Sequence, residues 1–291
     1  TCTNPCGENG ATCEICGECG SSTTGMNGCF DYNCNTPPPP PTPDSTMNKD
    51  PHLKFANGAT ADFRGLNNTV FNILSYPNIS FSMKTTDVSF LLPKPTKVDG
   101  SFFTEAFFLL SESSRKFLLH VDASMPGFEY YSLNTVPTKK IKRYKSFEYN
   151  NMYFGVKPDY YELSTLDWVI TVLRKPIYNS LTDNMNWRLD TRIKSKSKYV
   201  IKNVHGIIGQ TFQKDRKYVE GRKDDYSGKT YVKTSAQAEG VIDGTYTDYI
   251  IKNVYKPDYK YSMFENSDKN EYYENDKKTA YSDEIVFKDF E

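Results

Sequence analysis

The side chains best suited to chemistry in this chain are its seven cysteines, because thiols form disulfides, bind metals and act as nucleophiles. All of them lie near the N-terminus: Cys2, Cys6, Cys13, Cys16, Cys19, Cys29 and Cys34. Three of them, Cys13, Cys16 and Cys19, are spaced C-x-x-C-x-x-C, which would let thiolates converge on zinc or an iron–sulfur cluster. The segment has no histidine and no second C-x-x-C at zinc-finger spacing, so we expect disulfides and no metal.

An odd number of cysteines leaves one thiol over when the others pair within the chain. The leftover thiol is a candidate for linking one chain to another. Disulfides persist in oxidising compartments, where small domains use them in place of a large hydrophobic core. We therefore predict an extracellular, secreted protein. A first residue other than Met, here Thr1, would also fit a mature secreted chain.

The three histidines, His52, His120 and His205, could in principle supply a three-histidine zinc site. They are far apart in the chain, so no local ligand spacing supports such a site. We expect each ring to be hydrogen-bonded in a structural role near a turn.

Acidic pairs such as Asp224-Asp225, or Asp122 near Glu112, could flank a sugar as glycosidase carboxylates do. With 36 acidic residues in the chain, such pairs arise by chance. The sequence has no G-x-S-x-G motif and no cysteine in its body to act as a nucleophile. The loop at residues 221–228 does not match a helix-loop-helix calcium site. We therefore predict a protein that is not an enzyme, with no catalytic residue, cofactor or metal.

Two triplets match the N-glycosylation sequon, Asn67-Asn68-Thr69 and Asn78-Ile79-Ser80. Each lies beside a predicted turn, where an acceptor asparagine can be exposed. We predict that Asn67 and Asn78 lie at the surface and carry glycans.

The composition limits the partners of the chain. Lys and Arg total 36 and so do Asp and Glu, which gives a formal net charge of zero. A balanced surface has no general attraction for nucleic acid or anionic membranes. No apolar run approaches the roughly 20 residues that span a bilayer. We expect neither a nucleic-acid partner nor a transmembrane segment.

The elements that must position these residues are strands. Aromatic residues make up 14% of the chain, and their rings favour strands. Short alternating segments with turn residues between them continue to residue 265, and no stretch keeps a 3.6-residue apolar period. The clearest strand candidates are residues 78–83, 116–121, 167–173, 186–193 and 198–204. The predicted fold class is all-β: a large antiparallel β-sandwich or curved sheet after a small disulfide-rich, loop-rich head.

These patterns divide the chain into four parts: a Cys-rich head (1–36), a Pro-rich linker (37–47), a β-rich domain (48–265) and a charged, Tyr-containing tail (266–291). The run PPPPPTP at 37–43 favours polyproline II and therefore a stiff spacer. In the tail, Ile285-Val286-Phe287 is either part of a solvated segment or a short strand. Such a strand would pair with a sheet edge in the same chain or a neighbouring one.

Three blocks of residues carry a resemblance to a known family. They are DPHLKFANGATADFRG at 50–65 with FNIL at 71–74, VHGIIGQTF at 204–212, and IDGTYTDY at 242–249 running on to YSMF at 261–264. Together these blocks resemble the root-cap/late-embryogenesis-like domain of secreted proteins. The first block is also similar, more distantly, to the opening of von Willebrand factor type D-like domains.

The resemblance covers roughly residues 50–264 in collinear order and implies a secreted, β-rich fold more firmly than an activity. Family members also carry a Cys-rich and Pro-rich segment ahead of the domain. Two departures stand out: Arg64 replaces the usual histidine, and the body lacks the cysteines of von Willebrand type D domains. We expect Gly206 and Gly209 to serve tight turns or a close approach of two backbones.

Two functions are consistent with these features. The first is a non-enzymatic extracellular structural protein of a wall, matrix or filament, which forms a homo-polymer through contacts of its head or tail. The alternative is a secreted carbohydrate-binding module whose exposed Tyr and Trp side chains stack on the sugar rings of an extracellular polysaccharide.

Overall fold

The computed structural model describes residues 43–93, 96–112, 115–133, 138–157, 160–197, 201–213, 218–265 and 286–289, with the backbone alone for 138–144 and 286–289. The chain divides into two compact units, Thr1–Pro41 and Thr42–Glu291. All the described residues belong to the second unit. The seven cysteines and the predicted disulfide head therefore lie outside the described residues.

The described part of this unit contains fifteen strands and two short 3₁₀ helices. They are β1 (Asp44–Asn48), β2 (His52–Lys54), β3 (Thr60–Asp62), β4 (Thr69–Tyr76), β5 (Ile79–Leu91), β6 (Lys97–Glu112), β7 (Arg115–Asp122), β8 (Phe128–Ser132), β9 (Thr138–Tyr149), β10 (Met152–Val156), β11 (Tyr160–Ser164), β12 (Trp168–Pro176), β13 (Trp187–Ser195), η1 (Gly209–Phe212), β14 (Tyr231–Lys233), η2 (Tyr246–Tyr249) and β15 (Val286–Asp289).

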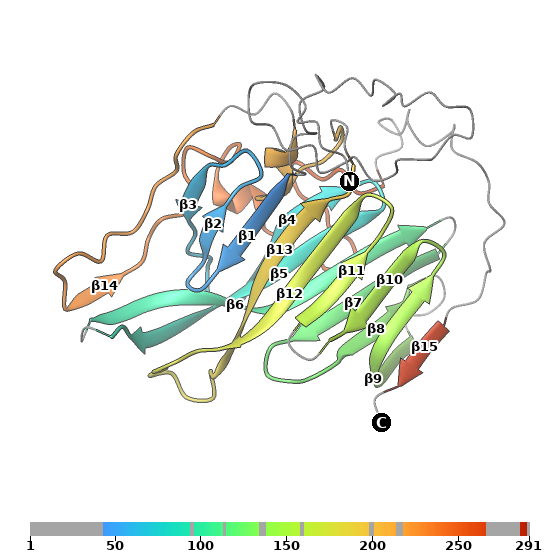
Figure 1. Cartoon of the computed structure of the whole chain (residues 1–291), viewed down its shortest axis with the longest axis horizontal. Helices are drawn as coiled ribbons and strands as arrows, with labels where there is room; N and C mark the ends of the chain where they lie inside the picture. Colours follow the sequence, from blue (N-terminus) through green and yellow to red (C-terminus); the bar gives the residue numbers. More distant parts are fainter. Residues whose placement is uncertain are drawn as a thin grey trace, which may run out of the picture. The chain divides into compact units, whose positions relative to one another are not determined.

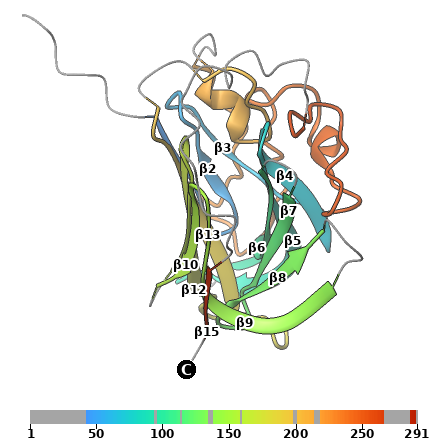
Figure 2. The same cartoon turned by 90° about the vertical axis from the view of Figure 1, so that its right-hand side faces the viewer.

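All these strands belong to one sheet, in the order β3-β2-β1-β13-β12-β11-β10-β9-β8-β7-β6-β5-β4. Every neighbouring pair in this order is antiparallel, and the additional pair of β14 with β6 is parallel. The sheet folds back on itself, so that β1–β3 and β10–β13 form one layer and β4–β8 the other (Figures 1 and 2). The long strand β9 curves from one layer to the other (Figure 2). The predicted all-β, sandwich-like class is confirmed.

Strand formation follows the period-two pattern of the sequence. In β12, Trp168, Ile170 and Val172 are buried, whereas the residues between them are half-buried. Successive side chains of a strand point to opposite faces, so this alternation places one apolar row against the other layer. The Asn57-Gly58 turn also forms as predicted: Gly58 has φ of +89° and joins the hairpin of β2 and β3.

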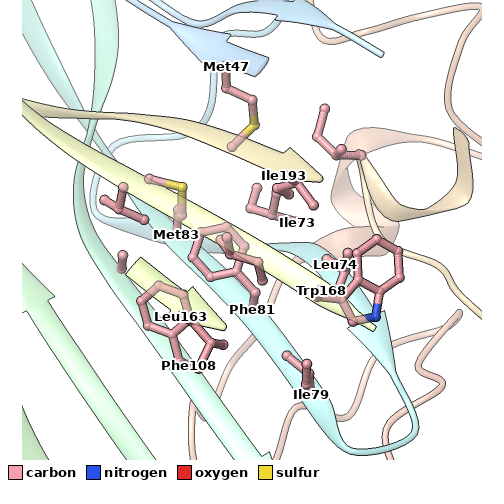
Figure 3. Close-up of a cluster of buried hydrophobic side chains, with 14 of the residues drawn as sticks. Met47, Ile73, Leu74, Ile79, Phe81, Met83, Phe108, Leu163, Trp168 and Ile193 are labelled. Atoms are coloured by element: carbon pink, nitrogen blue, oxygen red, sulfur yellow. The ribbon is translucent and has the colours of Figure 1, made fainter. Parts of the chain in front are cut away.

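The hydrophobic core lies between the two layers. Its main cluster combines residues from both layers, including Met47, Ile73, Leu74, Ile79, Phe81, Met83, Phe108, Leu163, Trp168 and Ile193 (Figure 3). A smaller cluster around Phe90 and Phe102 lies where β5 and β6 extend beyond the main core. The rings supply much of the buried apolar area, as expected for a chain this rich in aromatic residues.

The segment after β13 differs from the prediction. Residues 198–204 were predicted to be a strand, but the described part, 201–204, is irregular. From residue 201 to 265, the described chain forms only the short strand β14 and the helices η1 and η2. We call the described residues 201–213 and 218–265 the edge segment, because this segment pairs with both terminal strands of the sheet.

The edge segment supplies backbone partners to β4 and β3. On β4, the N–H and C=O of Ser75 bond with His205, and the C=O of Val70 accepts from Ile251 N–H. On β3, the Asp62 N–H donates to the carbonyl of Arg222, and the Thr60 carbonyl accepts from Gly221 N–H. A terminal strand with unpaired backbone groups invites pairing with other chains, so the edge segment removes that liability from β3 and β4.

One predicted boundary shifts, and one of the two alternatives for the tail is observed. Residues 44–47 were assigned to the linker, but they belong to β1, which pairs with β2 and β13. The reason is that Met47 is buried in the core, which polyproline would not achieve. At the other end, Val286–Asp289 forms β15, which pairs with β9 of the same chain.

Among the described residues, no helix has the length and apolar character needed to cross a membrane.

Candidate functional site

The three histidines occupy three separate polar clusters, so the structure does not bring them together as zinc ligands. His52 lies on β2, His120 on β7, and His205 beside the edge of β4. Each ring bonds to different carboxylates. Across the described part of the chain, no group of His, Cys, Asp and Glu side chains is arranged to hold a metal ion.

The His52 cluster forms because the β2–β3 register pairs His52 with Asp62. The two side chains share a short hydrogen bond of 2.6 Å between His52 Nδ1 and an Asp62 carboxylate oxygen. On the other side of the ring, His52 Nε2 lies 3.6 Å from Asp50, which accepts a hydrogen bond from Tyr226. The D-P-H and D-F-R-G parts of the first motif block therefore meet as one carboxylate–imidazole–carboxylate group.

Electrostatics favour a charged imidazole in this cluster. The hydrogen bond to Asp62 raises the pKa of His52, and the nearby Asp50 charge adds to the effect. Burial raises the pKa of Asp50, although the Tyr226 hydroxyl and His52 oppose this. The cluster thus has the groups of a proton-transfer site, but each of them is engaged by a neighbour.

Next to this cluster is a small open hollow with no enclosed space for a water molecule, lined in part by Asp50, Asp62, Arg64, Ser101 and Asp224. Ligand pockets usually enclose about 300–1,000 Å³, so the hollow is too small for a typical substrate. The buried hydroxyl of Ser101 has no hydrogen-bond partner there.

The His205 cluster joins the second and third motif blocks to the first. His205 Nε2 lies 3.3 Å from Asp243 Oδ2, and its Nδ1 accepts the Gly206 N–H, which leaves Nε2 as the donor to Asp243. The ring of His205 stacks on Tyr261 with centroids 4.5 Å apart. The Tyr249 ring lies near both of them, with its centroid 5.9 Å from that of His205 and 5.5 Å from that of Tyr261.

Gln210 is the centre of this cluster and is completely buried. Its amide nitrogen donates to the Gly206 carbonyl and to the Tyr249 hydroxyl, and its amide oxygen accepts the Asp243 N–H. The Tyr249 hydroxyl in turn donates to the carbonyl of Asp243. A buried amide is costly unless its donors and acceptors are paired, and here they are.

Asn72 of the F-N-I-L sequence anchors the same region to the sheet. Its side-chain nitrogen donates to Ser80, and its oxygen accepts the Tyr259 hydroxyl. Gly206 packs directly against this residue with φ of +106°, and a Cβ there would lie 2.6 Å from the Ile73 carbonyl oxygen. The expected close approach at Gly206 is therefore confirmed, and it explains why glycine stands at this position.

The His120 cluster is a row of side chains across four neighbouring strands on the outward face of β5–β8. His120 Nε2 lies 2.8 Å from Glu105, and its Nδ1 lies 3.2 Å from Glu129. Lys84 extends the row through a 2.5 Å contact with the other oxygen of Glu105. The Phe107 ring lies parallel to the imidazole, with centroids 4.6 Å apart.

The hydrogen bonds of this row favour the charged forms of Glu105 and His120. Burial alone would raise the pKa of Glu105, but hydrogen bonds from His120 and Lys84 outweigh it and lower the pKa to about 2. Burial alone would lower the pKa of His120, because it disfavours the charged imidazole. The bonds to Glu105 and Glu129 outweigh burial and raise the pKa of His120. When His120 is protonated, the row alternates cation and anion from strand to strand, which is a stable cross-strand arrangement.

The acidic pairs considered for catalysis are not paired in space. Asp122 lies opposite Glu105 at one end of the β6–β7 pair, whereas Glu112 lies at the other end, opposite Arg115. Asp224 accepts the backbone N–H of Ser235. Its neighbour Asp225 instead forms an ion pair of 2.9 Å with Lys229. The loop at 221–228 is held by these local bonds.

The two sequons differ in exposure. Asn67 is exposed in the turn before β4, where its side-chain oxygen accepts the Asp87 N–H. Asn78 is half-buried in the β4–β5 turn, and its side-chain oxygen is enclosed without a partner. The hydroxyl of Ser80, the third residue of that sequon, is buried and accepts from Asn72. Asn67 thus has the expected surface position, whereas Asn78 is only partly accessible. Glycosylation of either stays a prediction.

Sequence reasoning missed several residues that organise these clusters. Gln210 and Tyr249 belong to the motif blocks, but the sequence suggested no role for them, and it did not single out Glu105 or Glu129. The alternation of β6 could have placed Glu105 on the outward face, beside His120 of the next strand. No local signal pairs Gln210 with Tyr249, because the contact joins residues far apart in the chain.

Comparison with known proteins does not identify a relative. No family model matches the chain, and no curated protein matches it. The resemblance to the root-cap/late-embryogenesis-like domain therefore stays a hypothesis based on the three motif blocks. In the structure, the three blocks meet around the His205 cluster, whereas the His52 cluster joins two parts of the first block.

Proposed function

We propose that this protein is a non-enzymatic, extracellular structural protein, in which the β-sheet unit is a rigid building block of a wall, matrix or filament. The observation that carries the proposal is the internal pairing of the three histidine clusters. In each of them, imidazole, carboxylate and hydroxyl groups bond to one another or to the backbone. Such networks rigidify a fold and specify one packing, whereas a catalytic site needs a group left available to a substrate.

The paired edges support the same role. Because residues 201–265 bond to the backbone of β3 and β4, these strands are not available as templates for uncontrolled pairing. A building block needs this protection at high local concentration. The covered edges also reduce the number of possible assembly contacts. A neighbouring chain cannot pair with β3 or β4, so it must contact the head, the tail or a side-chain surface.

The test is the native size of the secreted protein. We expect a polymer by light scattering under oxidising conditions and a smaller species after reduction, since the odd cysteine links chains through the head. A Cys34→Ser variant would show whether the Cys34 thiol is the one that links chains, because the other six cysteines of the head are unchanged. A full-length protein that stays monomeric at high concentration under oxidising conditions would remove the main support for this function.

A second candidate, a secreted carbohydrate-binding module, is favoured by one surface row. Leu91 of β5, Lys97 of β6 and Tyr231 of β14 are at the same level across three paired strands, and Tyr231 is 50% exposed. Tyr178, which is 76% exposed, lies in a neighbouring loop. A hydrogen bond from the Leu91 N–H to the Asn179 carbonyl joins this loop to the end of β5. Exposed rings beside charged groups are what sugars stack on and bond to.

The tryptophans do not contribute to such a platform, contrary to our expectation. Trp168 is fully buried in the core. Trp187 is half-buried, and the Arg174 guanidinium lies 3.5 Å from its ring centre. Both indoles pack on the core from inward positions on β12 and β13, where their ring area stabilises it.

A glycan array tests the second candidate. If it is correct, the protein binds a defined polysaccharide, and a Tyr178→Ala/Tyr231→Ala variant loses most of that binding. Tyr218→Ala is the matched control, because Tyr218 is 58% exposed and lies elsewhere, near the β2–β3 turn. Equal loss in both variants, or no glycan bound at all, would exclude this row as a sugar site.

A further inference from the structure

The β9 strand has an edge that the rest of the sheet does not cover. Its first part pairs with β8, and this pairing ends at Tyr144. Its last part, Ser146–Tyr149, pairs with β10. The second edge of that last part is taken by β15, which pairs with Tyr144, Ser146, Phe147 and Glu148.

β15 and β10 must lie on opposite edges of β9, because both pair with Ser146 and Phe147. Tyr144 pairs with β8 as well as with β15, so β15 lies on the edge of β9 opposite both β8 and β10. Without β15, the outer N–H and C=O groups of residues 146–148 would have no strand partner among the described residues. Unlike the edges of β3 and β4, this edge is covered by a separate strand from the end of the chain and not by the edge segment.

The chain length between the two regions allows exchange between copies. Twenty residues, 266–285, separate the edge segment from β15. At up to about 3.5 Å per residue, such a connection reaches roughly 70 Å when extended. Within the described residues, β15 pairs only with β9, over four residues and with a register irregularity. Backbone pairing of this kind is the same whether the strand comes from the same chain or from another.

We propose that the edge of β9 at Tyr144–Glu148 is the acceptor for β15 of a second copy of this chain. Each copy carries one donor strand and one acceptor edge. Reciprocal exchange closes a dimer, and one-way donation continues into a chain of copies. The inference rests on the proposed structural function and names the contact by which the tail links subunits. Pairing within one chain dominates at low concentration, because the tether keeps β15 near its own β9.

Lysine cross-linking of mixed isotopes tests this exchange in the full-length protein. Unlabelled and ¹⁵N-labelled proteins are mixed, concentrated and treated with an amine-reactive cross-linker. Lys145 of β9 and Lys288 of β15 are next to one another in register, since Lys288 pairs with Ser146. We expect Lys145–Lys288 peptides that join a labelled to an unlabelled half, in a proportion that rises with concentration. The control is the pair Lys97 and Lys233 on β6 and β14, which should remain within one chain.

Three results would overturn the inference. They are Lys145–Lys288 peptides that stay unmixed at every concentration, the absence of that cross-link, and equal mixing at Lys97–Lys233. A Phe287→Pro variant adds a second measurement, because proline removes a donor and disrupts strand pairing. We expect this variant to lose the mixed cross-links, whereas Phe287→Tyr, which retains strand propensity, keeps them.

The experiment is performed with the head thiols reduced and alkylated, so that it does not depend on disulfide links. Mixed tail cross-links in a protein that never polymerises would support the exchange and contradict the structural function. A disulfide-linked polymer with only unmixed tail cross-links would support the function and contradict the exchange.

Discussion

The His205 and His120 clusters use the same residue type in opposite ways. His205 is buried at the edge of β4, where one nitrogen accepts a backbone N–H and the other faces Asp243. His120 lies on an outward sheet face between two carboxylates, with 17% of its side chain exposed. The first cluster joins segments far apart in the chain, and the second joins neighbouring strands.

The two clusters therefore stabilise the fold by different physical effects. The His205 cluster depends on close backbone contact and fully paired buried groups, so losing one member leaves others unsatisfied. The His120 cluster depends on charge, which water partly screens at this exposure. We therefore expect changes near His205 to affect stability strongly at all pH values, and changes near His120 to act weakly and with pH.

The largest effect is expected from Gly206→Ala. The φ of +106° and a Cβ position 2.6 Å from the Ile73 carbonyl oxygen force the edge segment away from β4. We expect a loss of about 3 kcal/mol or more in the free energy of unfolding, measured by urea denaturation. Gly228→Ala is the control, because Gly228 has φ of +65° and open space, so its cost should be about 1 kcal/mol.

The next effect is expected from Tyr249→Phe. The substitution removes the hydroxyl that accepts from Gln210 and donates to the Asp243 carbonyl, while the buried ring remains. We expect a loss of about 1–3 kcal/mol in the free energy of unfolding. Tyr255→Phe, at a residue 44% exposed, should change it by less than about 0.5 kcal/mol. Similar values for the two variants would show that the buried network has no special weight.

The pH dependence of the His120 cluster gives a smaller effect. The folded pKa of His120 is raised above its unfolded value by the bonds to Glu105 and Glu129, against the effect of burial. Its stabilisation is therefore complete below about pH 6.5 and is lost as the pH rises through the folded pKa. Compared with His120→Gln, the wild type should be more stable by roughly 1 kcal/mol at the acidic end of this window.

Chemical denaturation of both proteins at several pH values checks this prediction. Above about pH 5, where Glu105 stays ionised, the difference between the two curves isolates His120, because His52, whose pKa is also raised, is present in both. Glu105 gives a second transition at acidic pH. Because its folded-state pKa is lowered to about 2, its contribution to the free energy of unfolding is lost only as the pH falls from about 4.3 to about 2. A difference that grows toward alkaline pH would contradict the assignment.

The smallest effect is expected from Lys116→Ala on β7. Lys116 bonds to Glu265 of the edge segment at 2.6 Å, but both side chains are about 40% exposed. Exposed ion pairs contribute about 0–1 kcal/mol and are screened by salt. We expect a loss within this range at low salt that diminishes at high salt. A loss as large as that of Gly206→Ala would show that charge, and not buried pairing, holds the edge segment.

Much of the layered sheet could be predicted from the chain. Residues 116–121, 167–173 and 186–193 form β7, β12 and β13 close to the expected positions. The strand expected at 198–204 was wrong for its described part, because those residues lead to the β4 edge, where His205 pairs with Ser75. Local alternation of polar and apolar residues indicates a strand. It does not show whether the segment joins the sheet as a strand or lies along its edge.

The sequence alone determined the all-β class, the Asn57-Gly58 hairpin and the separation of a cysteine-rich start from a cysteine-free body. Each depends on neighbouring residues: a period of two, a turn that tolerates positive φ, or composition. Only the tertiary structure decided that Gln210 meets Tyr249, that His205 meets Asp243, and that residues 201–265 cover the edges of β3 and β4. Those contacts join residues far apart in the chain, so they form only when the whole sheet positions both partners.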